Sequence, residues 1–504
     1  MRTIAAITAL LTITACGAPI AVAADIIPVI DFDRGAMTAQ HGLVFSVGDR
    51  PDKVNDRLHA AGEPRRACWQ INVADDAPSE GACGFIPLFD NRSGNRPRNL
   101  LDASTAQFVH LSLIGDLGKR SLKIDVVPGI VTAAERWGAT AGVLSGIDIN
   151  DSEWKDTKVS LDLEGLDKTQ LGSIRLTLSG EGPAWVAVSD VWFSAGADTA
   201  RPNAYAAEVP AGHPLRRATW VWYTREIIAD SAQSAELLRF CTAHQITDIF
   251  LQIPYQYEDG VVTLEMPDAL RAFNVAAHRV GITVHALDGR PEFILERNHD
   301  RMFRFVEAIA KFNAAGDADG RYSAIHLDNE PYVMEGWRND AERKTIIHDY
   351  VKLNRELSRR IHDANMRFGV DIPFWWDDID SDGNPKFTAP APSGGQMPLI
   401  DAVFDCMDNV GIMSYRERAT GPNGVIGCCA TEFDLGVRKN VGVFASVELG
   451  TGPNVEPGIT FGVFPMQYFN AQLETLTRAL AYTEGCAGIA IHYYRVYLAL
   501  ETQS

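Results

Sequence analysis

Hydrophobic and polar residues alternate in short segments between residues 25 and 200. The clearest of these segments are Phe108–Ile114, Ser121–Val126, Lys158–Leu163, Ser173–Leu178 and Val186–Phe193. An alternation with a period of two, bounded by Gly, Asp and Asn, is typical of half-buried antiparallel strands. Several such strands without a long helical pattern predict a β-sandwich over residues 25–200.

The pattern changes after residues 201–215, which are rich in proline and are predicted to be a linker. Eight short apolar runs follow, most of them succeeded by an amphipathic helical pattern: Ala218–Thr224, Thr247–Pro254, Ile282–Asp288, Ser323–Glu330, Phe368–Trp376, Asn409–Tyr415, Val441–Glu448 and Gly488–Tyr493. Strands that alternate with helices pair in parallel through right-handed crossovers. Eight such units predict a (β/α)8 TIM barrel over residues 216–504. The alternative is an open doubly wound sheet, but no glycine-rich phosphate-binding motif follows an early strand.

Residues 1–24 are predicted to be an export signal. Arg2 precedes the apolar run Ile4–Ala15, which is too short to span a bilayer. Ala21–Ala23 matches the small residues that precede a signal-peptide cleavage site. Alternatively, Ile13–Cys16 resembles a lipobox, which would leave a lipid anchor on Cys16 of a periplasmic or extracellular protein. No other stretch is apolar enough for us to expect a membrane span.

Acidic residues outnumber basic residues, at 65 against 46, which gives a net charge of −19. This balance disfavours binding to nucleic acid and to anionic membranes, so a neutral substrate is the simplest expectation. Export permits disulfides, and Cys68 and Cys83 are a candidate pair in the N-terminal half. The sequence gives no indication of the oligomeric state.

Catalytic residues of TIM barrels lie at the carboxyl ends of the strands. Here those ends are rich in carboxylates and aromatic rings, a mixture that suits sugars, since rings stack on apolar sugar faces and carboxylates bind hydroxyls or transfer protons. The candidate substrate-binding residues are Trp222, His285, Asp328, Asn329, Asp371, Trp376, Tyr415 and His492. For each of them, packing in the core or a solvated rim position is the structural alternative. Three histidines occur among these strands, but no His-x-His opens the first one, and we expect neither a metal nor another cofactor.

Two glutamates are the main catalytic candidates. Glu330 ends the fourth predicted strand within Asn329-Glu330-Pro331, and Glu448 ends the seventh. Glycoside hydrolysis needs two carboxyl groups, about 5–5.5 Å apart for retention and about 6.5–9.5 Å apart for inversion. Together with Tyr415, this arrangement resembles the clan of retaining TIM-barrel glycoside hydrolases. That resemblance implies that Glu330 is the general acid/base, that Glu448 is the nucleophile and that Asn329 holds the sugar 2-hydroxyl.

A second resemblance rests on Asp328-Asn329-Glu330 and on Met413-Ser414-Tyr415, which are similar to the chitinase-type barrel. In that family an Asp two residues before the acid Glu positions the acetamido group of the substrate, which then acts as the nucleophile. The chain departs from the pattern at Ser323 and His326, where the family has acidic residues. It departs again at Arg416, which follows the tyrosine where the family has Asp.

The sequence therefore predicts an exported glycoside hydrolase with a β-sandwich followed by a catalytic barrel. The segment Trp154–Phe193 resembles the closing strands of a galactose-binding-like module, which implies that the sandwich binds carbohydrate. The alternatives are substrate-assisted hydrolysis of N-acetylhexosaminides through Asp328 and Glu330, and a polysaccharide-binding envelope protein without catalysis. Neither resemblance covers more than residue patterns, and fold alone does not decide between these functions.

Overall fold

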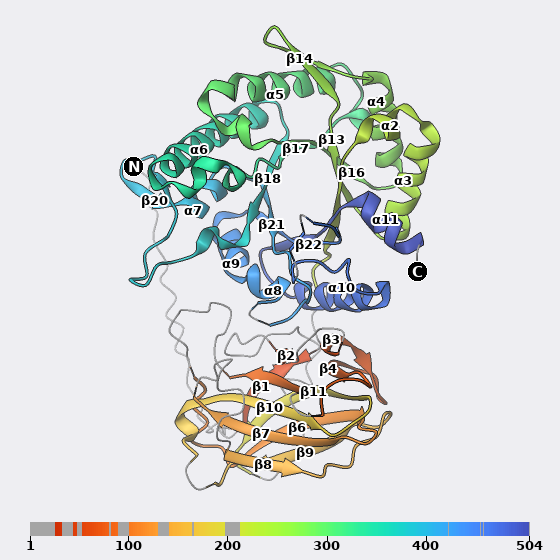
Figure 1. Cartoon of the computed structure of the whole chain (residues 1–504), viewed down its shortest axis with the longest axis vertical. Coiled ribbons are helices and arrows are strands. Elements are labelled where there is room, and N and C mark those ends of the chain that lie inside the picture. Colours follow the sequence, from red (N-terminus) through yellow and green to blue (C-terminus); the bar gives the residue numbers. More distant parts are fainter. Residues whose placement is uncertain are drawn as a thin grey trace, which may run out of the picture.

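Parallel strands close into a barrel in one part of the molecule, and two antiparallel sheets face each other in the other part (Figure 1). The computed structural model describes residues 26–32, 44–47, 53–79, 82–88, 100–129, 141–163, 166–196, 212–421, 423–453, 455–456 and 458–502. The predicted export signal, including Cys16, and most of the predicted linker lie outside the described residues.

The N-terminal part is a β-sandwich, as predicted. One sheet has the order β3-β4-β11-β6-β9, with β1 paired to β11, and the other has the order β2-β5-β10-β7-β8. The strands are β1 (Ile26–Asp31), β2 (Phe45–Val47), β3 (Val54–Ala61), β4 (Arg66–Val73), β5 (Ala82–Pro87), β6 (Phe108–Asp116), β7 (Ser121–Pro128), β8 (Ala141–Ser145), β9 (Lys155–Ser160), β10 (Leu171–Ser179) and β11 (Ala184–Ser194). Alternating Val, Ile and Leu side chains of the two inner faces form the core between the sheets.

Cys68 and Cys83 lie on opposite outer faces of this sandwich. A Cβ at Gly84 would collide with the side chain of Trp69 across the core, so the neighbouring Cys83 points away from the core. Cys68 precedes Trp69 on β4 and packs on the other side of its sheet, against Ala187. The expected disulfide between these two cysteines is therefore wrong, because neighbouring residues of a strand point to opposite faces.

All eight predicted barrel strands are present, and they close in the order of the sequence. They are β12 (Arg216–Val221), β13 (Asp248–Gln252), β16 (Thr283–Asp288), β17 (Ala324–Leu327), β18 (Arg367–Pro373), β21 (Asn409–Met413), β22 (Gly442–Glu448) and β23 (Cys486–His492). Every neighbouring pair is parallel. The fold is thus a (β/α)8 barrel, and the open-sheet alternative is excluded.

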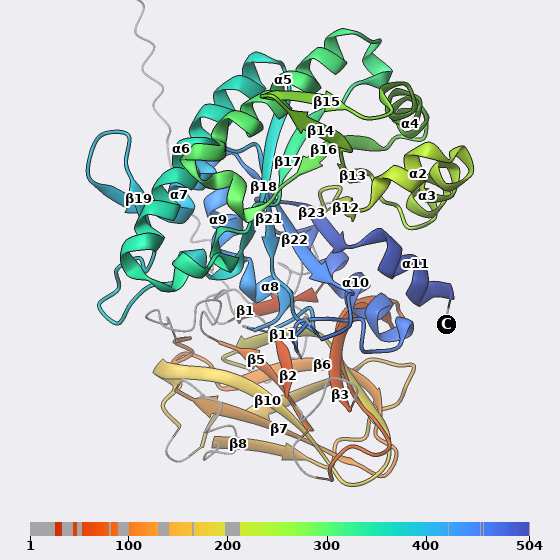
Figure 2. The same cartoon turned by 45° about the horizontal axis from the view of Figure 1, so that its top comes forward.

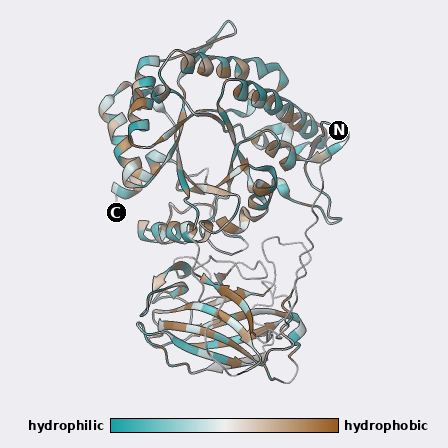
Figure 3. Ribbon diagram, turned by 180° about the vertical axis from the view of Figure 1, so that it is seen from behind, coloured by the Kyte–Doolittle hydropathy of each residue, from teal (hydrophilic) through white to brown (hydrophobic). Residues whose placement is uncertain are grey.

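Helices surround the barrel (Figure 2). They are α2 (Thr224–Ala229), α3 (Ser231–Ala243), α4 (Pro267–Arg279), α5 (His299–Ala314), α6 (Asp340–Asp363), α7 (Leu399–Phe404), α8 (Val425–Cys428), α9 (Ala430–Lys439), α10 (Met466–Leu480) and α11 (Tyr494–Thr502). Two hairpins are inserted: β14 (Tyr255–Glu258) with β15 (Val261–Leu264), and β19 (Thr388–Pro390) with β20 (Gln396–Pro398). Figure 3 shows hydrophobic residues concentrated on the strands, while the outer helices carry both kinds. Among the described residues, no helix combines the length and the apolar character needed to cross a bilayer.

Asp56 on β3 joins the sandwich to the barrel. Its buried carboxylate accepts hydrogen bonds from Trp69 Nε1 (2.8 Å) within the sandwich and from the hydroxyl of Thr420 in the barrel. Its carbonyl oxygen accepts from Gln472 Nε2 on α10 (2.7 Å). Thr420 belongs to the loop that follows β21, so the sandwich anchors a loop at the face of the barrel where the strands end.

Candidate active site

Four carboxylates from three barrel strands or the residues after them act electrostatically on the phenol of Tyr415. They are Asp328 and Glu330 after β17, Asp371 on β18 and Glu448 at the end of β22. Burial, and then the negative charges of these four groups, raise the pKa of Tyr415 well above its ordinary value. The structure therefore brings together five of the residues that were singled out at the strand ends of the sequence.

Glu330 is partly buried directly after β17, where its backbone adopts a left-handed conformation with φ = 42°. Non-glycine residues rarely adopt this conformation, and it is enriched at functional sites. The hydroxyl of Tyr332 donates a hydrogen bond to Glu330 Oε1. Burial raises the pKa of Glu330, and the charge of Asp371 raises it further, whereas the Tyr332 bond and the nearby His492 lower it. Glu330 is thus biased towards the protonated form that a general acid needs.

Asp328 lies beside Glu330 and shares its environment. Burial raises the pKa of Asp328 well above its usual range, and the charges of Asp371 and Glu330 act in the same direction. Its Oδ1 atom is buried and has no hydrogen-bond partner among the described residues. A buried carboxyl group with a raised pKa and a free oxygen is a candidate for a functional role.

Two ring nitrogens contact one carboxylate oxygen of Asp371. Trp220 Nε1 donates to Asp371 Oδ2 (2.9 Å), and His326 Nε2 lies 2.8 Å from the same oxygen. A Cβ at Gly411 would lie 2.1 Å from Asp371 Oδ1, so the neighbouring strand needs glycine there. Asp371 is only 3% exposed, and its charge acts on Asp328, so the two carboxyl groups lie near each other.

Glu448 is oriented by a chain of hydrogen bonds. His492 Nδ1 lies 2.7 Å from Glu448 Oε2, and Trp222 Nε1 donates to His492 Nε2 (3.1 Å). Since an indole N–H can only donate, Nε2 of His492 accepts and Nδ1 carries the proton that bonds Glu448. The amide of Gly450 donates to the other carboxylate oxygen. Trp222 and His492, predicted as substrate-binding residues, thus hold Glu448 in place.

The structure corrects two predicted substrate-binding residues. His285 is the third residue of β16, and its Nε2 lies 2.9 Å from Asp248 Oδ1, low in the barrel. Burial lowers the pKa of His285 to about 4, and the ring is 1% exposed. Trp376 is also 1% exposed and packs between Trp337 and Tyr350 in the hydrophobic core. Neither side chain can contact a sugar in the mouth.

Asn329 is buried with only part of its amide engaged. Its Oδ1 accepts from the backbone N–H of Arg290 (3.3 Å), whereas Nδ2 has no partner among the described residues. This donor suits the hydroxyl that the resemblance assigns to Asn329, a role that stays a prediction.

One side chain of the site escaped the sequence reasoning. Tyr332, two residues after Glu330, bonds its carboxyl group, and the half-buried ring of Trp375 lies 5.6 Å from the Tyr332 ring. A donor two residues beyond a candidate acid was the available signal, within the run Asn-Glu-Pro-Tyr. In the part of the chain that the structure describes, no cluster of three or more His, Cys, Asp and Glu side chains is arranged as a metal site.

The protein is thus a two-part molecule, in which a β-sandwich precedes a parallel eight-stranded barrel with carboxylates gathered at its mouth. No protein-family model and no curated protein matches the chain.

Solved structures do match at low identity. The chitinase of Chromobacterium violaceum is 15% identical, with 57% of this chain and 98% of that chain covered, at a TM-score of 0.35. The CBM22-1–GH10 modules of xylanase 10B from Clostridium thermocellum are 11% identical, with 93% of this chain and 90% of that chain covered, at a TM-score of 0.35. The spore cortex-lytic enzyme SleL of Bacillus cereus is 11% identical, with 57% of this chain and 72% of that chain covered, at a TM-score of 0.37. The proposals below rest on the side chains of the site and not on these similarities.

Proposed function

We propose that the protein is an exported glycoside hydrolase that retains the anomeric configuration. Glu330 acts as general acid/base and Glu448 as nucleophile. The observation that carries the proposal is the contrast between the two glutamates. Burial and negative neighbours raise the pKa of Glu330, whereas Glu448 accepts hydrogen bonds from His492 and from the amide of Gly450, which fix its orientation.

The two residues would act in a double displacement. Glu330 transfers its proton to the glycosidic oxygen while a carboxylate oxygen of Glu448 attacks the anomeric carbon, and the leaving sugar departs with its new hydroxyl. Glu330, now ionised, then takes a proton from water, which attacks the anomeric carbon and releases Glu448. Tyr332 stabilises the ionised form of Glu330 between the two steps.

A second candidate mechanism uses the acetamido group of the substrate as the nucleophile. The observation that favours it is the unpartnered Oδ1 of Asp328, buried beside Glu330 and Asp371. Such an atom could accept the acetamido N–H and orient its carbonyl oxygen towards the anomeric carbon. In that case Glu330 remains the acid/base, and Glu448 has no covalent role.

Three isosteric variants distinguish these mechanisms on a panel of glycans with and without acetamido groups. Glu330→Gln should abolish turnover in both. Glu448→Gln should abolish turnover in the double displacement only, and azide should restore a Glu448→Ala variant with formation of a glycosyl azide of inverted configuration. Asp328→Asn should be the inactive variant in the substrate-assisted mechanism, which cannot cleave glycans that lack the acetamido group. Binding without cleavage across the panel would favour the non-catalytic alternative.

We further propose that the sandwich binds carbohydrate. Trp154 and Trp185 are half-buried and pack together on the outer face of the β3-β4-β11-β6-β9 sheet, whereas Trp69 and Trp192 belong to the core. The guanidinium of Arg66 lies 5.5 Å from the Trp154 ring centroid, which leaves Trp185 as the better stacking surface. Trp185→Ala should weaken retention of the protein on polysaccharide gels. The proposed export is tested separately, by cell fractionation, which should find the protein outside the cytoplasm.

A further inference from the structure

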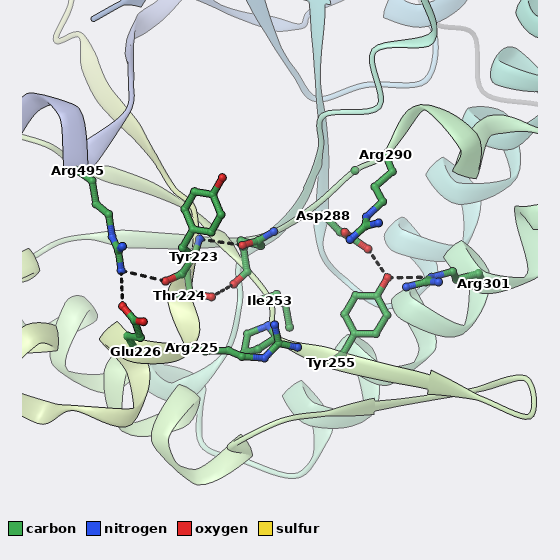
Figure 4. A pocket seen from close by; sticks show the side chains of 13 residues that line it. Tyr223, Thr224, Arg225, Glu226, Ile253, Tyr255, Asp288, Arg290, Arg301 and Arg495 are labelled. Carbon is green, nitrogen blue, oxygen red and sulfur yellow. Dashed lines mark hydrogen bonds and ion pairs between the residues drawn. The ribbon is translucent and has the colours of Figure 1, made fainter. Parts of the chain in front are cut away.

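A cavity of about 500 Å³ flanks the carboxylates at the mouth of the barrel. Its walls come from the segments that follow β12, β13 and β16, together with the start of α11, so it opens on the catalytic face (Figure 4). Two contacts tie it to the candidate site. The backbone N–H of Arg290 donates to Asn329 Oδ1 (3.3 Å), and the N–H of Asp328 donates to the carbonyl oxygen of Asp288 (3.0 Å).

The residues that line this cavity include more arginines than carboxylates, unlike the chain as a whole. Four arginines line it, against two carboxylates, Glu226 and Asp288, in a protein whose net charge is −19. The arginines are Arg225, Arg290, Arg301 and Arg495. An excess of fixed positive charge in a cleft attracts anions, and solvent screening confines the effect to the neighbourhood of the cleft.

Two of these arginines are engaged with carboxylates at the edge of the cavity. Arg225 forms a two-pronged ion pair with Glu265, through Nε (2.7 Å) and NH2 (2.9 Å). Arg495 donates to Glu226 (3.2 Å) and to the carbonyl oxygen of Tyr223 (3.3 Å). These two guanidinium groups therefore hold the wall together on one side.

The other two arginines face the cavity from the opposite side. Arg301 donates only through Nε, to the hydroxyl of Tyr255 (3.2 Å), and its guanidinium lies 4.6 Å from the ring centroid of Phe293. Its two terminal amino groups form no hydrogen bond with any residue in the described part of the chain. Arg290 lies 3.9 Å from Glu292, a long contact between two exposed side chains. Both guanidinium groups are thus available to a ligand, on the side of the cavity where the backbone of Arg290 contacts Asn329.

The wall also constrains what kind of ligand fits. Tyr255 donates its hydroxyl proton to Asp288 Oδ2 (2.6 Å), so this buried carboxylate has a hydrogen-bond donor other than Arg290 and Arg301. The exposed ring of Tyr223 lies on the other side of the cavity. Tyr223 follows Trp222, the residue that donates a hydrogen bond to His492. Two available guanidinium groups and an exposed aromatic ring in one cavity suit an acidic sugar unit, whose charged group can bond the arginines while its apolar face stacks on the ring.

We propose that this cavity binds the negatively charged substituent of a sugar unit that neighbours the one cleaved, so that the substrate is an acidic glycan. The proposal deepens the proposed glycosidase function and rests on it. Arg290 and Arg301 provide the charge-assisted hydrogen bonds, which suit both a uronate carboxylate and a sulfate. Binding of such a group would fix the register of the glycan relative to Glu330 and Glu448.

Binding can be measured separately from catalysis with the full-length Glu330→Gln variant. The probes are gels that contain alginate or polygalacturonate for carboxylates, κ-carrageenan for sulfate, and carboxyl-reduced polygalacturonate or dextran as neutral controls. We expect retardation by an anionic polymer at least about tenfold stronger than by its neutral counterpart, lost at high salt. Adding Arg290→Gln or Arg301→Gln should weaken this preference about tenfold, which corresponds to the loss of one charge-assisted hydrogen bond.

Arg304→Gln is the matched control, because Arg304 lies one turn from Arg301 on α5 and pairs with Glu307 outside the cavity. Equal binding to anionic and neutral polymers overturns the proposal. The proposal also fails if the Arg290→Gln and Arg301→Gln variants prefer the anionic polymer as strongly as the Arg304→Gln variant does. The polymer that is retained shows whether the group is a carboxylate or a sulfate. Turnover by the wild-type protein is scored independently: charge-dependent binding without cleavage refutes the glycosidase function alone, and cleavage that prefers neutral glycans refutes the acidic substrate alone.

Discussion

Replacing Tyr332 by Phe removes the hydroxyl that donates a hydrogen bond to Glu330 Oε1 and leaves the ring in place. The ring contributes an edge-to-face contact with Trp375, at 5.6 Å, which the variant keeps. The change therefore acts on the ionised form of Glu330, which accepts this bond. Burial and Asp371 already favour the protonated form, and the variant removes the hydrogen bond that opposes them.

The size of the effect follows from the energy of one hydrogen bond to a charged group. Such a bond contributes about 1.5 kcal/mol net, and one pKa unit corresponds to about 1.4 kcal/mol. The pKa of Glu330 should therefore rise by about one unit in the Tyr332→Phe variant. Because a general acid must be protonated, activity is lost as the pH rises through this pKa. The alkaline limb of the profile should move upward by about the same amount.

The assay is the dependence of kcat/KM on pH, since this ratio reports the ionisation of the free enzyme. Tyr482→Phe is a suitable control, because Tyr482 is an exposed tyrosine in the turn after α10. We expect the limb of the control to coincide with that of the wild-type protein. An alkaline limb that stays in place or moves downward in Tyr332→Phe would refute the assignment of this limb to Glu330.

Three further predictions concern the surroundings of the two glutamates. Asp328→Asn should raise the melting temperature at pH 8 and leave it nearly unchanged at pH 4, because burial raises the pKa of Asp328 and the wild-type fold loses stability as the pH rises from the unfolded-state pKa to the folded one. Trp222→Phe should lower kcat about tenfold with little change in thermal stability, since it frees His492 from the bond that fixes its tautomer. Asp56→Ala should destabilise the protein by about 3 kcal/mol in urea titrations, because it leaves buried donors of both the sandwich and the barrel unpaired.

The architecture could be predicted from the sequence because each element carries its own periodicity. The run Phe108–Ile114 alternates strictly and became β6, and the run Val441–Glu448 ends on the glutamate that closes β22. Strand ends in a parallel barrel share one face, so Glu330 and Glu448 could be placed at the same mouth before any side chain was seen.

Side-chain direction limited the prediction of the site. His285 stands in the middle of β16, where the strand places it low in the barrel, and this depth depends on register rather than on residue type. Trp376 follows β18 in a short 3-10 helix that turns it into the core, and no local signal separates it from the half-exposed Trp375. The contact of Asp56 with Thr420 joins residues 364 positions apart, which no local pattern reveals.

The net charge of the chain does not determine the charge of the groups that line the cavity beside the barrel mouth. Burial raises the pKa of both Asp328 and Glu330, so these two carboxyls keep their protons to a higher pH than exposed carboxyls do. The charges of Arg290 and Arg301 act on Asp288 in the wall of the cavity, and the backbone of Arg290 contacts Asn329 beside Asp328 and Glu330. Charges farther than about 8 Å are largely screened at physiological ionic strength, so an approaching glycan responds to the nearest groups. An acidic protein can therefore present a locally cationic site, and it is the local excess of arginine that leads us to expect an acidic glycan.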